Sequence, residues 1–191
     1  WLHEFMGLIH AVSAHFLLRK CKPLGSKIRA AQKSNAILDT PAEEAYDQLA
    51  TLAARLCGTP MAVVNFLDSE RQWFKAAVGV PLRQTDRAIS FCTHALSGTR
   101  APMVVADARQ HPLFADNPLV VGEPHVRLYA CVPLITPEGA ALGTLAVLDT
   151  VPRALTDEQL EGLKILAGQV MVLLELRRQQ RLLSQLVQER D

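Results

Sequence analysis

Apolar and polar positions change rhythm along the chain, and five short stretches have the features of strands. Each stretch is rich in β-branched, aromatic or aliphatic residues and is bounded by Gly, Pro or acidic turns. They lie at 61–67, 71–78, 103–106, 127–135 and 142–148. Short polar turns at 68–70 and 137–139 join two pairs of these stretches. Strands joined by tight turns run antiparallel, so the pattern predicts an antiparallel sheet.

Helix signals flank the predicted strands. Thr40, followed by Pro41 and Glu43, predicts a helix with its N-cap at Thr40. The expected buried face of this helix consists of Tyr46, Leu49, Leu52, Ala53 and Leu56. A short helix is expected at 89–96, and Thr156 is expected to cap a long final helix. Helices packed on an antiparallel sheet make an α+β fold.

The final helix is longer than the sheet can cover. Roughly 35 residues at about 1.5 Å each would extend about 50 Å. The spacing of about 3.5 residues that is typical of a coiled coil is kept by Val172, Leu176, Leu183 and Leu186. We therefore expect this helix to pair with a second copy of the chain or with an N-terminal helix, and we expect a homodimer built by the terminal helices.

Residues 1–35 differ in composition from the rest of the chain. A 3-4-3-4 spacing of apolar residues predicts an amphipathic helix that presents Leu2, Phe5, Ile9, Val12 and Phe16. A basic, polar linker follows at 21–34. The chain begins with Trp1, so the alternative is an extension encoded by a vector. The expected organisation is a helix and linker at 1–35, a compact domain at 36–178 and a helical extension at 179–191.

Composition narrows the classes of function. The chain has 20 basic and 19 acidic residues, a net charge of +1 and only 5% aromatic residues. Proteins that bind nucleic acids normally have a basic surplus or stacking aromatics, so we expect no nucleic-acid partner. No apolar run reaches the 18 or so residues of a membrane span, and the basic start of a secretory signal is missing. We expect a cytoplasmic protein whose 4 cysteines are reduced.

Several short motifs occur in the order typical of one family. They lie at 37–41, 68–75, 90–94, 105–109, 114–118, 129–134, 143–149 and 152–156. Together they resemble a GAF domain, the small-molecule sensing module of bacterial signalling proteins such as histidine kinases and diguanylate cyclases. Two positions depart from the family pattern, because Cys131 stands where glycine is commoner and Ala146 where cysteine is commoner.

The resemblance implies both a fold and a site. The first and last helices would pack on one face of the sheet, with a ligand pocket on the other face under the short helix and the long loop at 111–124. The residues expected around the ligand are Phe91, Cys92, His94, Asp107, Arg109, Phe114, Asn117, Arg127, Tyr129 and Cys131. The ligand or cofactor stays open between a cyclic nucleotide, an amino acid, haem and none. The implied partner is a kinase or cyclase output domain, reached through the last helix.

Cys92 and His94 are the first candidates for chemistry. Residues two apart on a helix point in different directions, so a direct pair between thiol and imidazole is not expected. Thr93 separates the cysteine from the histidine, whereas the bilin-binding relatives have the two adjacent, so no bilin is expected. Cys92 and Cys131 are expected to be free and redox-accessible.

Two other groupings have simple explanations. Asp107 and Arg109 are expected to form an ion pair within a turn, and the alternative is that they grip an acidic ligand. The spacing of Asp107, His111 and His125 matches no zinc pattern, so no metal is expected.

Two classes of function follow. The first is a sensory and regulatory module without catalysis, and the second is a small thiol enzyme such as a free methionine sulfoxide reductase that uses Cys92 or Cys131. The sequence shows no convergence of nucleophile, base and orienting residue, so the sensory class is favoured.

Overall fold

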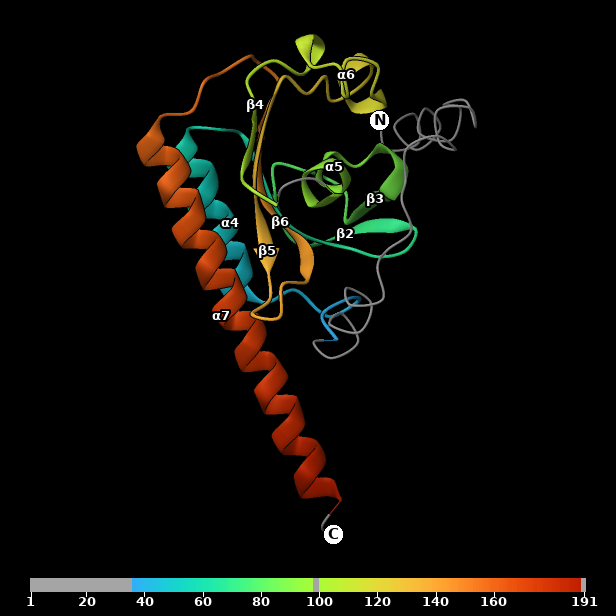
Figure 1. Cartoon of the computed structure of the whole chain (residues 1–191), viewed down its shortest axis with the longest axis vertical. Coiled ribbons are helices and arrows are strands. Elements are labelled where there is room, and N and C mark those ends of the chain that lie inside the picture. Colours follow the sequence, from blue (N-terminus) through green and yellow to red (C-terminus); the bar gives the residue numbers. More distant parts are fainter. Residues whose placement is uncertain (1–35, 98–99, 190–191) are drawn as a thin grey trace.

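The computed structural model describes residues 36–97 and 100–189. Figure 1 labels most of its helices and strands. In chain order they are α4 (Glu44–Cys57), β1 (Met61–Leu67), β2 (Arg71–Val78), β3 (Gln84–Asp86), the 3-10 helix η1 (Arg87–Ile89), α5 (Phe91–Ser97), β4 (Met103–Val105), the 3-10 helix η2 (Ala108–Gln110), α6 (Pro118–Val121), β5 (Leu128–Ile135), β6 (Ala141–Asp149) and α7 (Asp157–Gln188). The amphipathic helix and linker expected at 1–35 lie outside the described residues.

The strands form one 6-stranded sheet in the order β3-β2-β1-β6-β5-β4. Every neighbouring pair is antiparallel, and the turns after β1 and β5 close two hairpins. The central strands β1 and β6 are buried along almost their whole length, because both faces of the sheet are covered. The α+β fold predicted from the sequence is therefore confirmed.

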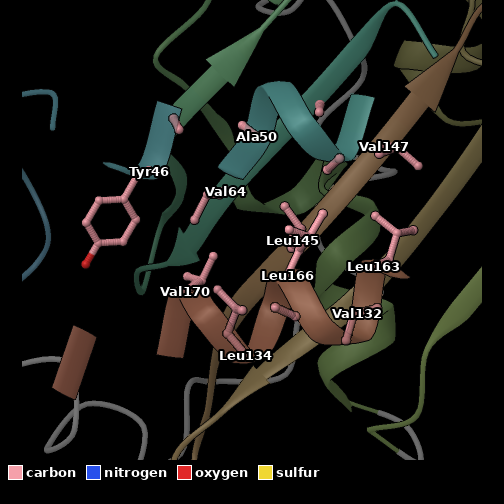
Figure 2. Packing of buried hydrophobic residues seen from close by; sticks show 14 of the residues in the cluster. Tyr46, Ala50, Val64, Val132, Leu134, Leu145, Val147, Leu163, Leu166 and Val170 are labelled. Carbon is pink, nitrogen blue, oxygen red and sulfur yellow. The ribbon is translucent and has the colours of Figure 1, made fainter. Parts of the chain in front are cut away.

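Helices α4 and α7 lie side by side on one face of the sheet, as expected (Figure 1). Figure 2 shows how Leu163, Leu166 and Val170 of α7 meet strand residues such as Val132 and Leu145. These side chains belong to one buried apolar cluster that joins both helices to the sheet. A second cluster lies on the opposite face, under α5, α6 and the loops between them.

Helix α7 begins with the predicted cap. Thr156 Oγ1 accepts a hydrogen bond from Gln159 N at 3.2 Å, and Gln159 Oε1 accepts one from Thr156 N at 3.0 Å. Gln159 Nε2 also donates to Leu56 O at 3.1 Å, which ties the start of α7 to the end of α4. The last buried residue of α7 is Leu174, so the second half of the helix extends past the sheet (Figure 1). Within the described ranges, no helix combines the length and hydrophobicity needed to cross a bilayer.

Helix α4 begins later than predicted, and Thr40 is not its N-cap. The helix starts at Glu44, and its N-cap residue, Glu43, makes no capping bond with its side chain. The Thr40 hydroxyl instead donates to Ile37 O at 2.7 Å and accepts from Lys75 Nζ at 2.9 Å. A buried ammonium group needs hydrogen-bond acceptors, and Lys75 donates to the Thr40 hydroxyl oxygen that was expected to cap the helix.

The buried face of α4 also differs in part from the prediction. The buried residues are Tyr46, Ala50, Ala53, Ala54 and Cys57. Leu52 and Leu56, which were expected to be buried, are 51% and 37% exposed. Small side chains allow a helix to lie close against its neighbours, so the alanines form the buried contact. Leu56 remains partly exposed and packs over Gly162 of α7.

Neither β3 nor the irregularity in β2 was predicted. Strand β3 is short and polar, and it exists as a strand only through its pairing with β2 at the sheet edge. In the β1–β2 ladder, Val64 pairs with Ala76 and Asn65 with Phe74, so Lys75 is an extra residue in β2. Such a bulge places Lys75 and Ala76 on the same face, toward α4.

Candidate functional site

A cavity of about 280 Å³ lies on the face of the sheet opposite α4 and α7. The sheet supplies its floor, and the loop after β2, the start of α5 and the segment from α6 to β5 supply its walls. The lining residues are Met61, Val63, Gln72, Phe74, Gly79, Val80, Pro81, Leu82, Thr85, Phe91, Leu119, Glu123, Pro124, Val126, Tyr129 and Leu148. The pocket therefore lies on the face that the resemblance implied, and its volume is at the lower end of ordinary small-molecule sites.

Strand alternation explains which side chains reach the cavity. Phe74 lines it, whereas the adjacent Trp73 belongs to the cluster under α4 and α7. Tyr129 lines it, whereas the adjacent Ala130 belongs to that other cluster. Successive side chains of a strand point to opposite faces, so the same strands carry both the cavity and the helix layer.

Aromatic side chains stack beside the cavity. The rings of Phe91 and Tyr129, which both line it, are stacked with centroids 4.9 Å apart. Behind them, Phe114 lies 4.5 Å from Phe91, and His111 stacks on Phe114 at 4.6 Å. The ring of His94 meets the edge of Phe114 at 5.3 Å. Phe114 and the two histidines thus support the aromatic wall and are not among the lining residues.

A few polar groups interrupt the apolar lining. Gln72 and Thr85 are paired across β2 and β3, and both line the cavity. The Thr85 hydroxyl is buried and has no hydrogen-bond partner within the part of the chain that the structure describes. The carboxylate of Glu123, 55% exposed, lies at the rim with His125 Nε2 at 3.8 Å. The cavity therefore offers hydrogen-bonding groups at the β2–β3 edge and a negative charge at its rim.

Asn117 and Arg127 hold the wall of the cavity in place. Asn117 Nδ2 donates to Ile89 O at 2.9 Å, and its Oδ1 accepts from Leu119 N at 2.9 Å, which caps α6. Arg127 donates to the carbonyl oxygens of Val120 and Val126 at 2.9 and 3.1 Å. Neither side chain lines the cavity, so both position the segment that covers it.

Asp107 and Arg109 form the internal ion pair that was expected. Arg109 Nη2 lies 2.6 Å from Asp107 Oδ2, and the Asp107 side chain caps η2. The hydrogen bond from the guanidinium lowers the pKa of the Asp107 carboxyl below its ordinary value. The carboxylate and the guanidinium neutralise each other, and neither Asp107 nor Arg109 lines the cavity.

The thiols of Cys92 and Cys131 are free, but the expectation that they are accessible was wrong. Both residues are 0% exposed and unbridged. Cys92 Sγ lies 2.8 Å from Ser90 Oγ. Burial raises the pKa of Cys92 to about 12 and that of Cys131 to about 11. These are structural thiols with little thiolate character at neutral pH.

The two departures from the GAF pattern face each other. Cys131 of β5 pairs directly with Ala146 of β6. Both are fully buried in the cluster on the cavity side of the sheet, and neither is a lining residue. Compared with the family pattern, Cys131 is larger than the commoner glycine and Ala146 is smaller than the commoner cysteine, so the two changes together conserve core volume. The Cys131 side chain therefore packs against the sheet and does not narrow the pocket.

Of the residues expected around a ligand, only Phe91 and Tyr129 line the cavity. The largest group missed is the loop Gly79 to Leu82, which follows β2. A signal for it exists in the sequence, since an apolar loop must cover something to escape water. Gly79 itself has a φ of 67°, and an added Cβ would lie 2.1 Å from Pro60 O, so glycine is required there.

Comparisons with known proteins agree with this architecture. The family profile of the GAF domain matches residues 41–174. A curated relative, the cyclic di-GMP phosphodiesterase PA2567 of Pseudomonas aeruginosa, is 44% identical over 117 residues, which are 61% of this chain. The chain spans only 20% of the length of that relative.

Solved structures share the fold at low sequence identity. The free methionine-R-sulfoxide reductase of Neisseria meningitidis superposes with a TM-score of 0.58 at 16% identity, over 85% of this chain and 99% of that one. The GAF domain of the Acinetobacter phosphoenolpyruvate-protein phosphotransferase superposes with a TM-score of 0.57 at 14% identity, over 80% of this chain and 95% of that one. The order of strands, the helix layer and the profile match agree, and the chain belongs to the GAF domain family.

Proposed function

We propose that this chain is a sensory and regulatory GAF domain that binds a small molecule in the cavity and transmits the signal through α7. The observation that carries the proposal is that the cavity and α7 lie on opposite faces of the same strands. Tyr129 and Leu148 line the cavity, whereas their neighbours Ala130 and Val147 lie in the cluster that contains α7. A shift of these strands on ligand binding would reach both layers at once.

The connection between β6 and α7 supports this route. Arg153 Nη2 lies 2.8 Å from Asp149 Oδ2 at the end of β6, and Arg153 N donates to Ala106 O at 3.1 Å. Pro152 precedes this arginine and limits backbone freedom in the connection. A displacement at the end of β6 would therefore move the start of α7 and would not be absorbed by a loose linker.

A homodimer is part of the proposal. The apolar residues of α7 that are half or more exposed are Ile165, Val172, Leu176, Leu183, Leu186 and Val187. Most of them follow the coiled-coil spacing noted above, and exposed apolar residues repeated along one side of a helix are typical of an interface. A second copy of the chain, presenting the same stripe, is the partner that the spacing favours.

The output domain and the setting are also proposals. The relative named as a cyclic di-GMP phosphodiesterase is about five times longer than the matched segment, so it has room for further domains. We place this chain in a cytoplasmic signalling protein with an output domain of the kinase, cyclase or cyclic-dinucleotide phosphodiesterase type. The thiol-enzyme alternative has no support from the site, because Cys92 and Cys131 are buried and are not among the residues that line the cavity described above.

The test measures the distance between spin labels on Gln180 of the two paired helices. The measurement is made with and without the molecule that native mass spectrometry finds in the purified protein. Labels at Gln48 on α4, which is packed on the sheet, control for movement of whole subunits. We expect the Gln180 distances to change and the Gln48 distances to stay constant. Unchanged Gln180 distances at saturating ligand would reject transmission through α7.

A further inference from the structure

We propose that the cavity binds an uncharged, predominantly apolar molecule of about two or three rings, and not a cyclic nucleotide or another anion. This inference rests on the proposed sensory function and names the class of ligand that the site takes. Three observations carry it: the volume of the cavity, the charges around it and the unpaired hydroxyl of Thr85 at the β2–β3 edge.

The volume sets the size of the ligand. A cavity of about 150 Å³ lined by aliphatic and aromatic side chains holds benzene. The present cavity of about 280 Å³ is nearly twice as large. Its lining is dominated by aliphatic side chains and by the rings of Phe74, Phe91 and Tyr129. An apolar molecule of this size therefore fits the space without leaving polar groups of its own unpaired.

The charges exclude an anion. The described residues that line the cavity include no Lys, Arg or His, and the charged residue among them is Glu123. The two nearby arginines considered above are engaged, Arg127 with carbonyl oxygens and Arg109 with Asp107. A phosphate or carboxylate in the cavity would lose its hydration without gaining a cation, and it would approach the Glu123 carboxylate.

Two residues that line the cavity, Thr85 and Tyr129, have a buried hydroxyl without a partner in the described part of the chain. We assign the polar end of the ligand to Thr85, because Gln72 lies opposite it in the β2–β3 ladder and adds a second polar group at this edge. A buried polar group without a partner is unusual in a folded protein. A ligand with one N–H or O–H group directed to this edge would supply the missing hydrogen bond, and the rest of the ligand would contact apolar side chains.

The experiment compares two fluorescent probes with the same skeleton. N-phenyl-1-naphthylamine is uncharged and has one N–H group, and 1-anilinonaphthalene-8-sulfonate adds only a sulfonate. We expect the uncharged probe to bind saturably with one site per chain, and the sulfonate to bind at least tenfold more weakly. Cyclic di-GMP is titrated as a competitor and is expected not to displace the uncharged probe.

Two variants of α6 locate the binding. Leu119, which lines the cavity and is half-buried, is changed in Leu119→Trp to fill it. Val121, on the same helix but 64% exposed and outside the lining, is changed in Val121→Trp as the matched control. We expect Leu119→Trp to abolish binding of the uncharged probe and Val121→Trp to leave it unchanged. Equal binding to both variants would place the probe elsewhere, for example on α7, and would overturn the inference.

Two further variants test the chemistry. Thr85→Val removes the hydroxyl but keeps the shape, and we expect the uncharged probe to bind several-fold more weakly while the melting temperature is unchanged or higher. Leu119→Arg adds a cation, and we expect it to strengthen binding of the sulfonate. If the sulfonate or cyclic di-GMP binds wild type as tightly as the uncharged probe and Leu119→Trp abolishes that binding, the class of ligand is wrong but a sensory role stands. If the uncharged probe binds as expected but the Gln180 distances do not change with the molecule found by native mass spectrometry, the class of ligand stands and transmission through α7 is rejected.

Discussion

Arg177 of α7 lies 2.6 Å from the carboxylate of Glu43, which precedes it by 134 residues. The same Glu43 oxygen accepts a hydrogen bond from Lys75 Nζ, also at 2.6 Å. The Lys75 side chain is fully buried and donates in addition to Thr40 Oγ1 and Pro41 O. One carboxylate therefore connects the sheet, through the bulge in β2, to the middle of α7.

The first prediction concerns this carboxylate. Glu43→Ala leaves the buried Lys75 without its counter-charge, so we expect the free energy of unfolding to fall by about 1–3 kcal/mol. This is less than the roughly 3–5 kcal/mol typical of a broken buried pair, because Glu43 is 41% exposed and Lys75 keeps two neutral acceptors. Urea unfolding at one fixed protein concentration measures the change.

The neighbouring glutamate is the control for this prediction. Glu44 is exposed and bonds Gln48 on the surface of α4. Glu44→Ala removes an acidic residue from the first turn of the helix, which costs about 0.5–1 kcal/mol at most. Equal losses for the two variants would mean that Glu43 acts only as a first-turn charge and that its contact with Lys75 contributes nothing.

The second prediction concerns the contact between the central strands. A Cβ on Gly143 of β6 would lie 1.8 Å from Asn65 O and 2.8 Å from Phe66 Cα of β1. Gly143→Ala must therefore push β6 away from β1, and we expect a loss of at least about 2–3 kcal/mol or failure to fold. At Gly168 in α7 nothing lies within 4 Å of an added Cβ. Gly168→Ala should raise stability by about 0.5–1 kcal/mol, and thermal unfolding of both variants tests the contrast.

The third prediction concerns the dimer. Replacing Leu183 and Leu186 together by Asp places charges in the proposed seam, so we expect sedimentation at about tens of micromolar to report a monomer. The control replaces Ser184 and Gln185, which are exposed on the same turn of α7, by Asp. The control is expected to remain a dimer. Wild type that sediments as a monomer at these concentrations would contradict the proposal itself.

The elements that could be predicted from the sequence are those defined by nearby residues. The Thr156 cap lies three residues from its partner Gln159, and the apolar strands carry their own pattern. The start of α4 could not be predicted, because Lys75 lies 35 residues after the Thr40 hydroxyl that it binds. Strand β3 could not be predicted either, since a short polar segment becomes a strand only when a partner supplies its hydrogen bonds.

The candidate site was harder to predict than the fold. Motif position identified Phe91 and Tyr129 because both lie at the ends of regular elements on the cavity side of the sheet. Motif position also selected Asn117 and Arg127, whose side chains donate hydrogen bonds to backbone carbonyl oxygens around the cavity. Sequence patterns cannot distinguish a polar residue that faces a ligand from one that holds a loop in place, because both occur in the same kind of loop and differ only in the direction of the side chain.

The fourth prediction concerns the three cysteines that the structure describes, Cys57, Cys92 and Cys131. All are buried and free, and burial raises their pKa values from about 9 to about 11, 12 and 11. At pH 8 a thiol with a pKa near 11 is ionised in only about one molecule in a thousand, so native protein should resist a thiol reagent. The Cys21→Ser variant removes the cysteine at 1–35, and we expect labelling of the other three only in urea.

The same pKa values predict how stability changes with pH. Each thiol holds its proton more tightly in the folded state than in the unfolded state. The contribution of this difference to stability is fully present below the unfolded pKa near 9. It is lost as the pH rises from 9 toward the folded pKa of about 11 or 12. The slope is at most about 1.4 kcal/mol per pH unit for each thiol. Urea unfolding of Cys92→Ala between pH 8 and pH 11 should show a shallower decline than wild type. Rapid labelling of native Cys92 at pH 8, or an unchanged slope in Cys92→Ala, would mean that this thiol is ionised or open to solvent. The thiol-enzyme class would then become the better hypothesis for the function of the chain.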